Sequence, residues 1–349
     1  MDFELSIING KTVSEIVRTH RGKCMDIVRK AYLTHADGQS VNPDSYFLRF
    51  PEKPDCRIIA LPAYLGNRFN VAGLKWIASY PGNIQRGFPR ASAVLVLNNY
   101  DTGYPFAILE SSIISAVRTA ASAALAAHWL NGRSQRAHAL GIVGTGFIAR
   151  YVYEFLMGTG WAIEEVRLYD QSRLKCEKFK NTVCRPEQHR AITVVPDAAQ
   201  LVKACDLIVF TTVASAPHIS DVTLFEHNPL VLHISLRDLA PEILLQAQNV
   251  VDDVEHVMKA DTSPHLAEQQ TGSRDFVTGT LAEIMLGRRA VNRGRPIIFS
   301  PFGMGILDLA VGKWVYDQAV ATGQDLRLAD FFYEVGGPQM KHRLRRSAT

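Results

Sequence analysis

Residues 139–150 read ALGIVGTGFIAR, and this stretch decides the fold. Its first part, residues 140–143, is an apolar run of the length that favours a buried strand. The turn that follows matches GxGxxA, in which Gly144 allows a tight turn, Gly146 lets the backbone approach a pyrophosphate, and Ala149 permits close packing of helix against sheet. The next helix directs free N–H groups and its positive dipole end at this turn, so a phosphate can bind there.

A second strand is expected at residues 166–169, and it leads into Asp170, 24 residues after Gly146. This spacing suits a carboxylate that accepts hydrogen bonds from the ribose hydroxyls of a dinucleotide and repels a 2'-phosphate. We therefore expect NAD rather than NADP, although Arg173 is placed to accommodate a phosphate. The alternative interpretation is a purely structural glycine turn in an α/β domain.

The rest of the chain divides into three parts. Short apolar strands alternate with helical stretches up to residue 300, which is typical of a doubly wound parallel sheet with helices on both faces. Before them, apolar runs separated by Pro and Gly turns predict an α+β region, and the Ala-rich segment 111–130 predicts a bridging helix. We expect an α+β domain for substrate binding and dimerisation over residues 1–120, a Rossmann-type domain over 121–300, and a helical segment over 301–349 that returns to the first domain.

Composition limits the possible functions. The chain has 349 residues, with 38 basic and 34 acidic side chains and a net charge of +4, too small for bulk attraction to nucleic acid or an acidic membrane. The basic cluster at residues 341–346 is expected to be a solvated tail. The five cysteines include no CxxC pair, and no apolar run reaches the roughly 18 residues that span a bilayer. These features predict a cytoplasmic protein.

Two further stretches extend the interpretation beyond the glycine turn. Gly73-Leu74-Lys75-Trp76 and Arg118-Thr119-Ala120-Ala121-Ser122, together with that turn, resemble the ornithine cyclodeaminase and mu-crystallin family over nearly the whole chain. The resemblance implies the fold described above, NAD-dependent chemistry on an amino acid and a homodimer formed through the first domain.

Four stretches resemble one branch of this family, which oxidises N-(2-amino-2-carboxyethyl)-L-glutamate to 2,3-diaminopropionate and 2-oxoglutarate, as in siderophore biosynthesis. They are residues 45–51, 76–83, 234–238 and 300–305. Where cyclodeaminases resemble GGDCPGK, residues 236–242 read LRDLAPE, which keeps the acid and puts cyclodeamination in doubt. Ornithine cyclodeaminase, an imino-acid reductase, an alanine dehydrogenase and a non-catalytic binding protein like mu-crystallin remain alternatives.

The resemblance also implies a substrate pocket lined by Arg49, Lys75 and Arg118. An arginine fork can form two parallel hydrogen bonds with a carboxylate, whereas lysine offers a compact charge that holds a substrate nitrogen or water. Asp238, which follows the strand expected at residues 231–234, is the acid/base candidate beside Lys75. A helix N-cap before Pro241 is an equally good interpretation of this aspartate.

Three hydroxyl side chains are candidate cofactor ligands: Thr119, Thr212 and Ser300. Thr212 and Ser300 each come at the end of a strand expected to face the cofactor cleft, and Thr119 adjoins Arg118. The acidic run from Asp252 to His256 has no metal-binding pattern, so we expect a solvated strand end there and no metal.

Overall fold

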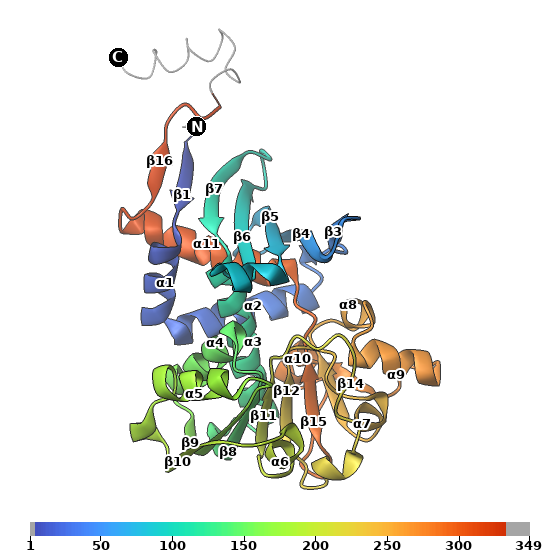
Figure 1. Cartoon of the computed structure of the whole chain (residues 1–349). Coiled ribbons are helices and arrows are strands. Elements are labelled where there is room, and N and C mark those ends of the chain that lie inside the picture. The colour runs from blue at the N-terminus through green and yellow to red at the C-terminus, as the bar shows by residue number, and fades with distance from the viewer. Residues whose placement is uncertain (1–3, 333–349) are drawn as a thin grey trace, which may run out of the picture.

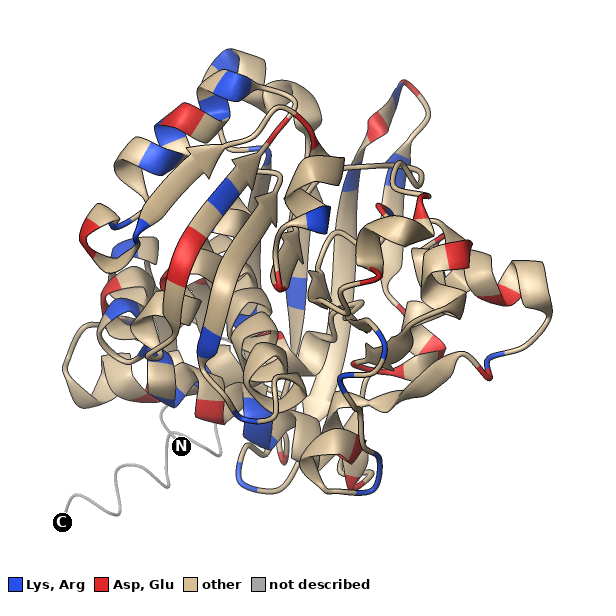
Figure 2. Ribbon diagram, turned by 90° about the horizontal axis from the view of Figure 1, so that it is seen from below, with Lys and Arg blue, Asp and Glu red and all other residues tan. Residues whose placement is uncertain are grey.

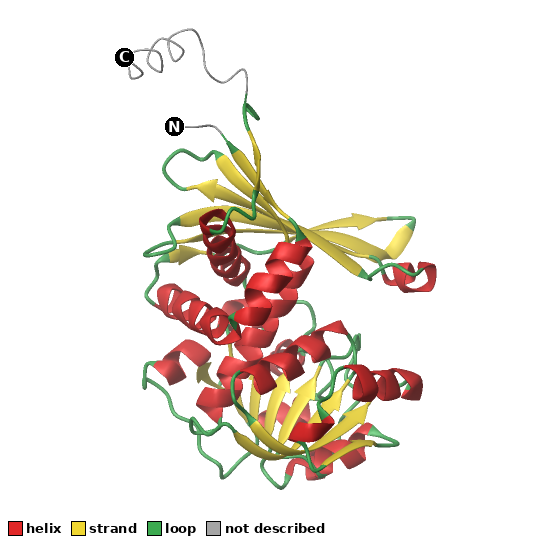
Figure 3. Ribbon diagram, turned by 90° about the vertical axis from the view of Figure 1, so that its left-hand side faces the viewer, coloured by secondary structure: helices red, strands yellow, loops and turns green. Residues whose placement is uncertain are grey.

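The computed structural model describes residues 4–332 as two α/β units stacked along the long axis of the molecule (Figure 1). The first unit is a mixed eight-stranded sheet with the order β16-β1-β7-β6-β5-β4-β2, in which β3 also pairs with β4. Its strands are β1 (Leu5–Ile8), β2 (Ser40–Val41), β3 (Tyr46–Phe50), β4 (Lys53–Leu65), β5 (Val71–Ser79), β6 (Ala91–Asn99), β7 (Pro105–Glu110) and β16 (Leu326–Leu328). The helices α1 (Gly10–Thr19), α2 (Arg21–Ala36) and α11 (Gly305–Ala321) lie on one face of this sheet (Figure 3).

The second unit is an eight-stranded parallel sheet with the order β10-β9-β8-β11-β12-β15-β13-β14. Its strands are β8 (Arg136–Val143), β9 (Ala162–Tyr169), β10 (Ala191–Val194), β11 (Leu207–Phe210), β12 (Leu230–His233), β13 (Gln248–Val251), β14 (Val277–Thr280) and β15 (Ile297–Ser300). The chain reverses direction across the sheet between β8 and β11, and open α/β sheets bind their ligands at such a switch point. The predicted Rossmann-type fold class is confirmed.

Helices cover the parallel sheet and connect its strands. They are α4 (Phe147–Gly158), α5 (Arg173–Thr182), α6 (Ala198–Lys203), α7 (Pro241–Leu245), α8 (Val254–Val257), α9 (Ser263–Thr271) and α10 (Leu281–Met285). Basic and acidic residues are interspersed along the ribbon in Figure 2. This distribution agrees with the small net charge.

The predicted bridging helix is α3 (Ser112–Leu130), which packs against α2, α4 and α11. By length and composition alone this helix could cross a bilayer, although Arg118 and several hydroxyl residues interrupt its apolar sequence. However, 67% of its most apolar window is buried inside the protein, because its alanines allow neighbouring helices to approach closely. Residue 120 lies in the middle of this helix, so the expected domain boundary cuts through a continuous element.

The segment after residue 300 packs against the first sheet. Helix α11 lies under β4, β5 and β6, and a Cβ added at Gly312 would come within 2.1 Å of the Leu95 side chain. Glycine is therefore required for this close approach. Strand β16 then pairs antiparallel with β1 at the edge of the sheet. The basic cluster at residues 341–346 lies outside the described residues.

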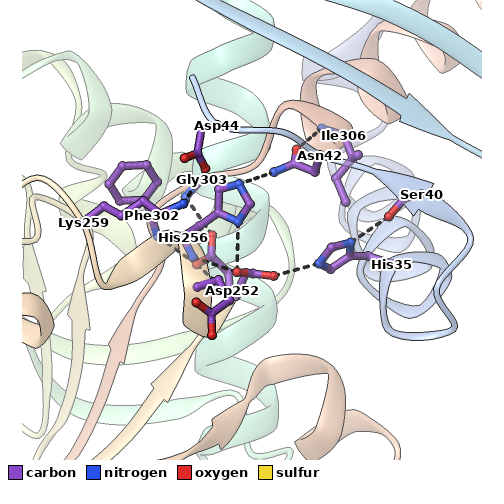
Figure 4. A network of polar contacts seen from close by, with 12 residues as sticks. His35, Ser40, Asn42, Asp44, Asp252, His256, Lys259, Phe302, Gly303 and Ile306 are labelled. Carbon is purple, nitrogen blue, oxygen red and sulfur yellow. Dashed lines mark hydrogen bonds and ion pairs between the residues drawn. The ribbon is translucent and has the colours of Figure 1, made fainter. Parts of the chain in front are cut away.

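A polar network joins the two units at the acidic run after β13 (Figure 4). Asp253 contacts His35 of α2 at 3.0 Å and His256 at 2.9 Å, and Asn42 donates to Nε2 of His256 at 2.9 Å. Asp252 is only 2% exposed, and it accepts the backbone N–H groups of residues 302 and 303. The expectation of a solvated strand end was therefore wrong, because these carboxylates fix the turn after β15 against the first unit. Within residues 4–332, no three His, Cys, Asp or Glu side chains form a metal-ligand group.

Candidate active site

The glycine turn between β8 and α4 has the geometry of a phosphate site. Gly144 has φ +88°, and a Cβ there would lie 2.9 Å from the backbone of Thr211, so only glycine fits. Gly146 caps α4, and a Cβ there would meet nothing within 4 Å. Protein packing therefore does not require this second glycine, and the open space above it suits a pyrophosphate at the helix N-terminus. Ala149 is fully buried beneath this turn.

Asp170 is fixed beside this turn by backbone hydrogen bonds. Its Oδ2 accepts the N–H of Thr145 at 2.9 Å, and its Oδ1 accepts the N–H of Ser172 at 3.0 Å. Oδ2 also accepts from Thr145 Oγ1 at 3.3 Å. A carboxylate has about four acceptor positions, so about one remains for a ribose hydroxyl. Arg173 lies 3.8 Å from Glu177 and is mostly exposed, so an acidic neighbour partly balances its charge. The residues at this end of the sheet fit a dinucleotide with an unphosphorylated ribose.

The first buried carboxylate of the site is Asp308, on α11. Its Oδ2 accepts a hydrogen bond from Lys75 Nζ at 2.8 Å, and Arg118 Nε lies 3.4 Å from its Oδ1. Lys75 is 2% exposed and Asp308 is fully buried, so β5, α3 and α11 each contribute one charge to an interior cluster. We call Lys75, Arg118 and Asp308 the Asp308 cluster. It carries one net positive charge, which suits a substrate carboxylate.

The environment of Lys75 favours proton exchange. Burial, followed by the positive charge of Arg118, lowers the pKa of Lys75 to about 8, although Asp308 acts in the opposite direction. An amine with a pKa near 8 is present in both protonation states at physiological pH. Lys75 is therefore able to hold a proton or to accept one.

The second buried carboxylate is Asp238, in the turn between β12 and α7. Its Oδ1 accepts from Thr212 Oγ1 at 2.5 Å and lies 3.0 Å from His218 Nε2, and its Oδ2 accepts from the Ser235 hydroxyl. The N-cap of α7 is Ala240, so the N-cap interpretation of Asp238 was wrong. We call Thr212, His218, His233, Ser235 and Asp238 the Asp238 cluster.

Burial would raise the pKa of Asp238, but hydrogen bonds from its neighbours, His218 first and Ser235 after it, hold this pKa well below its usual range. His233 Nε2 lies 3.1 Å from the Asp238 backbone N and accepts its proton, so this nitrogen cannot also donate to the carboxylate. His233 Nδ1 then donates to Ser300 Oγ at 3.3 Å. We therefore assign the charged state of Asp238 mainly to His218 and the hydroxyl donors.

Backbone strain positions Asp238. Leu236 has φ +69°, a left-handed conformation that costs a branched, non-glycine residue of the order of 1–3 kcal/mol. Its carbonyl accepts the N–H of Ser263 at 2.7 Å, and its side chain is buried. This packing holds the strained turn and directs the Asp238 carboxylate toward Thr212 and His218.

The turn after β15 connects the two clusters. Ser300 contacts His233 of the Asp238 cluster, and a Cβ added at Gly303 would lie 2.5 Å from Nη1 of Arg118 in the Asp308 cluster. Only two residues separate Ser300 from Gly303, so both clusters lie at the carboxyl end of the central strands. This edge of the parallel sheet is also where the glycine turn lies.

The other residues expected in the site have different surroundings. Arg49 lies on exposed β3, 5.2 Å from the ring centre of Phe47, and its substrate role stays a prediction. Thr119 donates to the Ser115 carbonyl of its own helix at 2.8 Å. The Thr212 hydroxyl donates to Asp238, and Ser300 is 1% exposed. Cofactor contacts of these three hydroxyls also stay predictions.

Sequence reasoning missed Asp308, His218 and His233. Asp308 is an acid inside the apolar helical stretch 306–316, and such a charge normally has a buried partner, so this signal was available. The spacing of the two histidines in the sequence does not indicate that they contact Asp238, because the fold brings the three side chains together.

The comparisons with known proteins agree with this geometry. The sequence profile of the ornithine cyclodeaminase/mu-crystallin family matches residues 8–323. The N-((2S)-2-amino-2-carboxyethyl)-L-glutamate dehydrogenase of Staphylococcus aureus is 28% identical over 327 residues, covering 91% of this chain and 96% of that protein. The alanine dehydrogenase of Archaeoglobus fulgidus is 30% identical over 320 residues, covering 88% and 94%.

A solved archaeal alanine dehydrogenase dimer with bound NAD has a similar structure, with a TM-score of 0.83 and 27% sequence identity. The alignment covers 94% of this chain and 100% of that one. The family match spans both units and includes the glycine turn, Lys75, Arg118, Asp238 and Asp308. The chain therefore belongs to the ornithine cyclodeaminase/mu-crystallin family.

Proposed function

We propose that this protein is an NAD-dependent oxidoreductase that cleaves N-(2-amino-2-carboxyethyl)-L-glutamate with water to L-2,3-diaminopropionate and 2-oxoglutarate. The observation that carries this proposal is the pair of buried clusters beside the glycine turn. One cluster offers a net positive charge and an amine with a pKa near 8, and the other offers a carboxylate linked to a half-exposed histidine. Together they provide carboxylate binding and proton transfer at a dinucleotide site.

Gly144, Gly146 and Ala149 form the pyrophosphate turn, and Asp170 is the ribose ligand. NAD, when bound, accepts a hydride from the carbon that carries the amine of the substrate. Thr119, Thr212 and Ser300 complete the expected cofactor contacts. Thr212 and Ser300 also hold Asp238 and His233, so we assign them a positioning role as well.

Arg118, and Arg49 by resemblance, hold the carboxylate next to the reacting carbon. Lys75 takes the proton from the substrate nitrogen, which leaves a carbon–nitrogen double bond in the substrate. His218, which is hydrogen-bonded to Asp238, accepts a proton from the water that adds to this carbon, while the Asp238 carboxylate orients the ring and balances its charge. The carbon–nitrogen bond then breaks, the amine leaves protonated, and the carbon becomes the keto group of 2-oxoglutarate.

The Staphylococcus aureus relative supports this substrate, and the Archaeoglobus fulgidus relative supports the alternative of alanine dehydrogenation. An imino-acid reductase or an ornithine cyclodeaminase would use the same two clusters. The enzyme class, an NAD-dependent oxidoreductase acting on carbon–nitrogen bonds of amino acids, is common to all but the cyclodeaminase.

Incubation of the purified protein with NAD and N-(2-amino-2-carboxyethyl)-L-glutamate, called the conjugate below, tests which of these reactions the protein catalyses. We expect NADH and 2-oxoglutarate in equal amounts, measured by absorbance and by mass spectrometry. Alanine and ornithine serve as comparison substrates. NADH from alanine but not from the conjugate would make the protein an alanine dehydrogenase, and ammonia from ornithine without net NADH would make it a cyclodeaminase.

We also infer a homodimer formed through the first sheet. Tyr46, Trp76 and Val94 follow one row across β3, β5 and β6 on the face away from Lys75, and all three are exposed. The helices lie on the opposite face (Figure 3). Light scattering should give twice the mass of the chain, and Trp76→Glu should halve it. A cytoplasmic location and a role in siderophore biosynthesis are part of the same proposal.

A further inference from the structure

Three arginines gather at one end of the first sheet, beside the turn that carries Asp238. Arg57 on β4 is in register with Ser79, which is in register with Ala91, the first residue of β6. Arg90 directly precedes that residue, and its carbonyl accepts the N–H of Tyr80 at 2.8 Å. Arg57 and Arg90 therefore lie at the same end of three neighbouring strands.

Two of these guanidinium groups lack partners. The Nε–H groups of Arg57 and Arg90 are buried and donate to no acceptor, and across residues 4–332 neither side chain forms an ion pair. Asp55, two residues from Arg57 on β4, is exposed and pairs with neither. A buried donor without an acceptor costs free energy, so such a group normally faces a ligand or an ordered water.

The third arginine comes from the other side of the cleft. Arg237 precedes Asp238 in the strained turn, and its guanidinium donates to the Ala260 carbonyl at 2.6 and 3.1 Å. Burial, followed by the positive charge of Arg57, lowers the pKa of both Arg90 and Arg237. The charge of Arg57 therefore acts on Arg90 within the first unit and on Arg237 across the boundary between the two units, while Asp261 and Asp238 act on Arg237 in the opposite direction.

Like charges held together in a partly buried place oppose folding unless an anion neutralises them. In the Asp308 cluster, Asp308 neutralises one of the two positive charges of Lys75 and Arg118. Around Arg57 and Arg90, by contrast, the described residues supply no acid within ion-pair distance. The missing negative charge must then come from a ligand, and the fork of an arginine matches a carboxylate.

We propose that Arg57, Arg90 and Arg237 form a second carboxylate site, which binds the acid groups of the substrate that lie away from the reacting carbon. The proposal rests on the proposed function, because the Asp308 cluster is assigned the carboxylate next to that carbon. It makes the enzyme selective for amino acids with two or more carboxylates. A substrate with a single carboxylate, such as alanine, leaves this second site unused.

Equilibrium binding tests the site apart from turnover. Wild-type protein saturated with NADH is titrated with 2-oxoglutarate, which has two carboxylates, and with pyruvate, which has one, while NADH fluorescence is recorded. We expect 2-oxoglutarate to bind at least 10-fold more tightly. Arg57→Gln and Arg90→Gln should each weaken 2-oxoglutarate binding by about 10- to 100-fold, the range for losing a charge-assisted hydrogen bond, and change pyruvate binding less than about threefold.

Two further variants serve as controls. Arg57→Lys keeps the charge and should recover part of the 2-oxoglutarate affinity. Arg68→Gln removes an exposed arginine from the turn between β4 and β5 and should change neither affinity. Thermal unfolding separates binding from folding: because Arg57 repels its neighbours, the ligand-free Arg57→Gln protein should melt no lower than wild type.

The outcomes distinguish the two proposals. Equal affinity of the wild type for both ketoacids, or equal losses for both in Arg57→Gln, would overturn the second site. A preference for 2-oxoglutarate that is lost in the variants supports the site even where the conjugate is not oxidised. If wild type and Arg57→Gln oxidise the conjugate with the same kinetics, the proposed function is supported and the proposed second carboxylate site is refuted.

Discussion

The two buried carboxylates of the cleft are stabilised in different ways. Asp308 faces two cations, Lys75 and Arg118, whereas Asp238 accepts hydrogen bonds from Thr212, Ser235 and an imidazole. In the Asp308 cluster, the aspartate balances one of the two positive charges and holds both cations in place. The remaining positive charge is available to bind an anion. The hydrogen bonds to Asp238 leave the carboxylate itself as the only full charge, next to the half-exposed His218 that can exchange protons with the cleft. On this difference we propose that Arg118 of the Asp308 cluster binds the substrate carboxylate, and that Lys75 and the hydrogen-bonded pair of Asp238 and His218 transfer protons.

The substitution Asp238→Asn tests the proton-transfer assignment and should have the largest effect. The amide has the same shape but carries no charge to orient and balance a protonated His218, so kcat should fall by about 10²- to 10⁴-fold. NAD binds at the glycine turn, so its Kd, measured by calorimetry, should change less than about threefold. Weakened NAD binding of the same size as the loss in kcat would instead assign Asp238 a structural role.

The substitution Asp308→Asn tests the charge balance of the other cluster. It leaves Lys75 and Arg118 buried without a counter-charge, so the free energy of unfolding should fall by about 3–5 kcal/mol in urea titrations. Asp317→Asn, on the same helix, breaks an exposed 2.6 Å contact with Lys313 and should cost under about 1 kcal/mol. Equal losses in the two variants would contradict a special role for the buried pair.

The pH dependence of catalysis reports on Lys75. Its pKa of about 8 means that the amine is mostly protonated below pH 8 and neutral above it. Because the neutral amine accepts the substrate proton, kcat/KM should rise with pH and level off above about pH 8. Lys75→Arg stays charged and should abolish this rise. Asp308→Asn removes the charge that raises the Lys75 pKa, so the rise should move to lower pH; a move to higher pH would refute the assignment.

The smallest effect is expected at Thr212, whose hydroxyl positions Asp238. Thr212→Val removes one hydrogen bond, worth about 1 kcal/mol, so kcat should fall roughly fivefold. Thr212→Ser keeps the hydroxyl and should retain nearly full kcat. If both variants lose cofactor affinity instead of kcat, the hydroxyl belongs to the cofactor site, as the sequence alone indicates.

The parts of the fold that the sequence predicts are those encoded by local patterns. Hydrophobic period and glycine spacing predict the strands around residues 140–143, 166–169 and 297–300 and the Ala-rich helix. They also predict that an α+β region comes before a parallel α/β region in the chain. Strands β1, β7, β14 and β16 were not expected, because β1, β14 and β16 are three or four residues long and their pairing partners are distant in the chain. Short strands are stabilised mainly by the neighbouring strands of the sheet. Those neighbours are distant in the sequence, so a local sequence pattern does not predict such strands.

The same division holds in the site. The sequence by itself determined the glycine turn, because Gly144, Gly146, Ala149 and Asp170 lie within one strand–helix–strand unit whose geometry is local. It also marked Lys75, Arg118 and Asp238 as candidates. Only the tertiary structure decided their partners: Asp308 lies 233 residues from Lys75, and the charge of Arg57 in the first unit acts on Arg237 in the second. Burial and charge balance depend on every element packed around a group, so they are properties of the assembled fold and not of any segment of the chain.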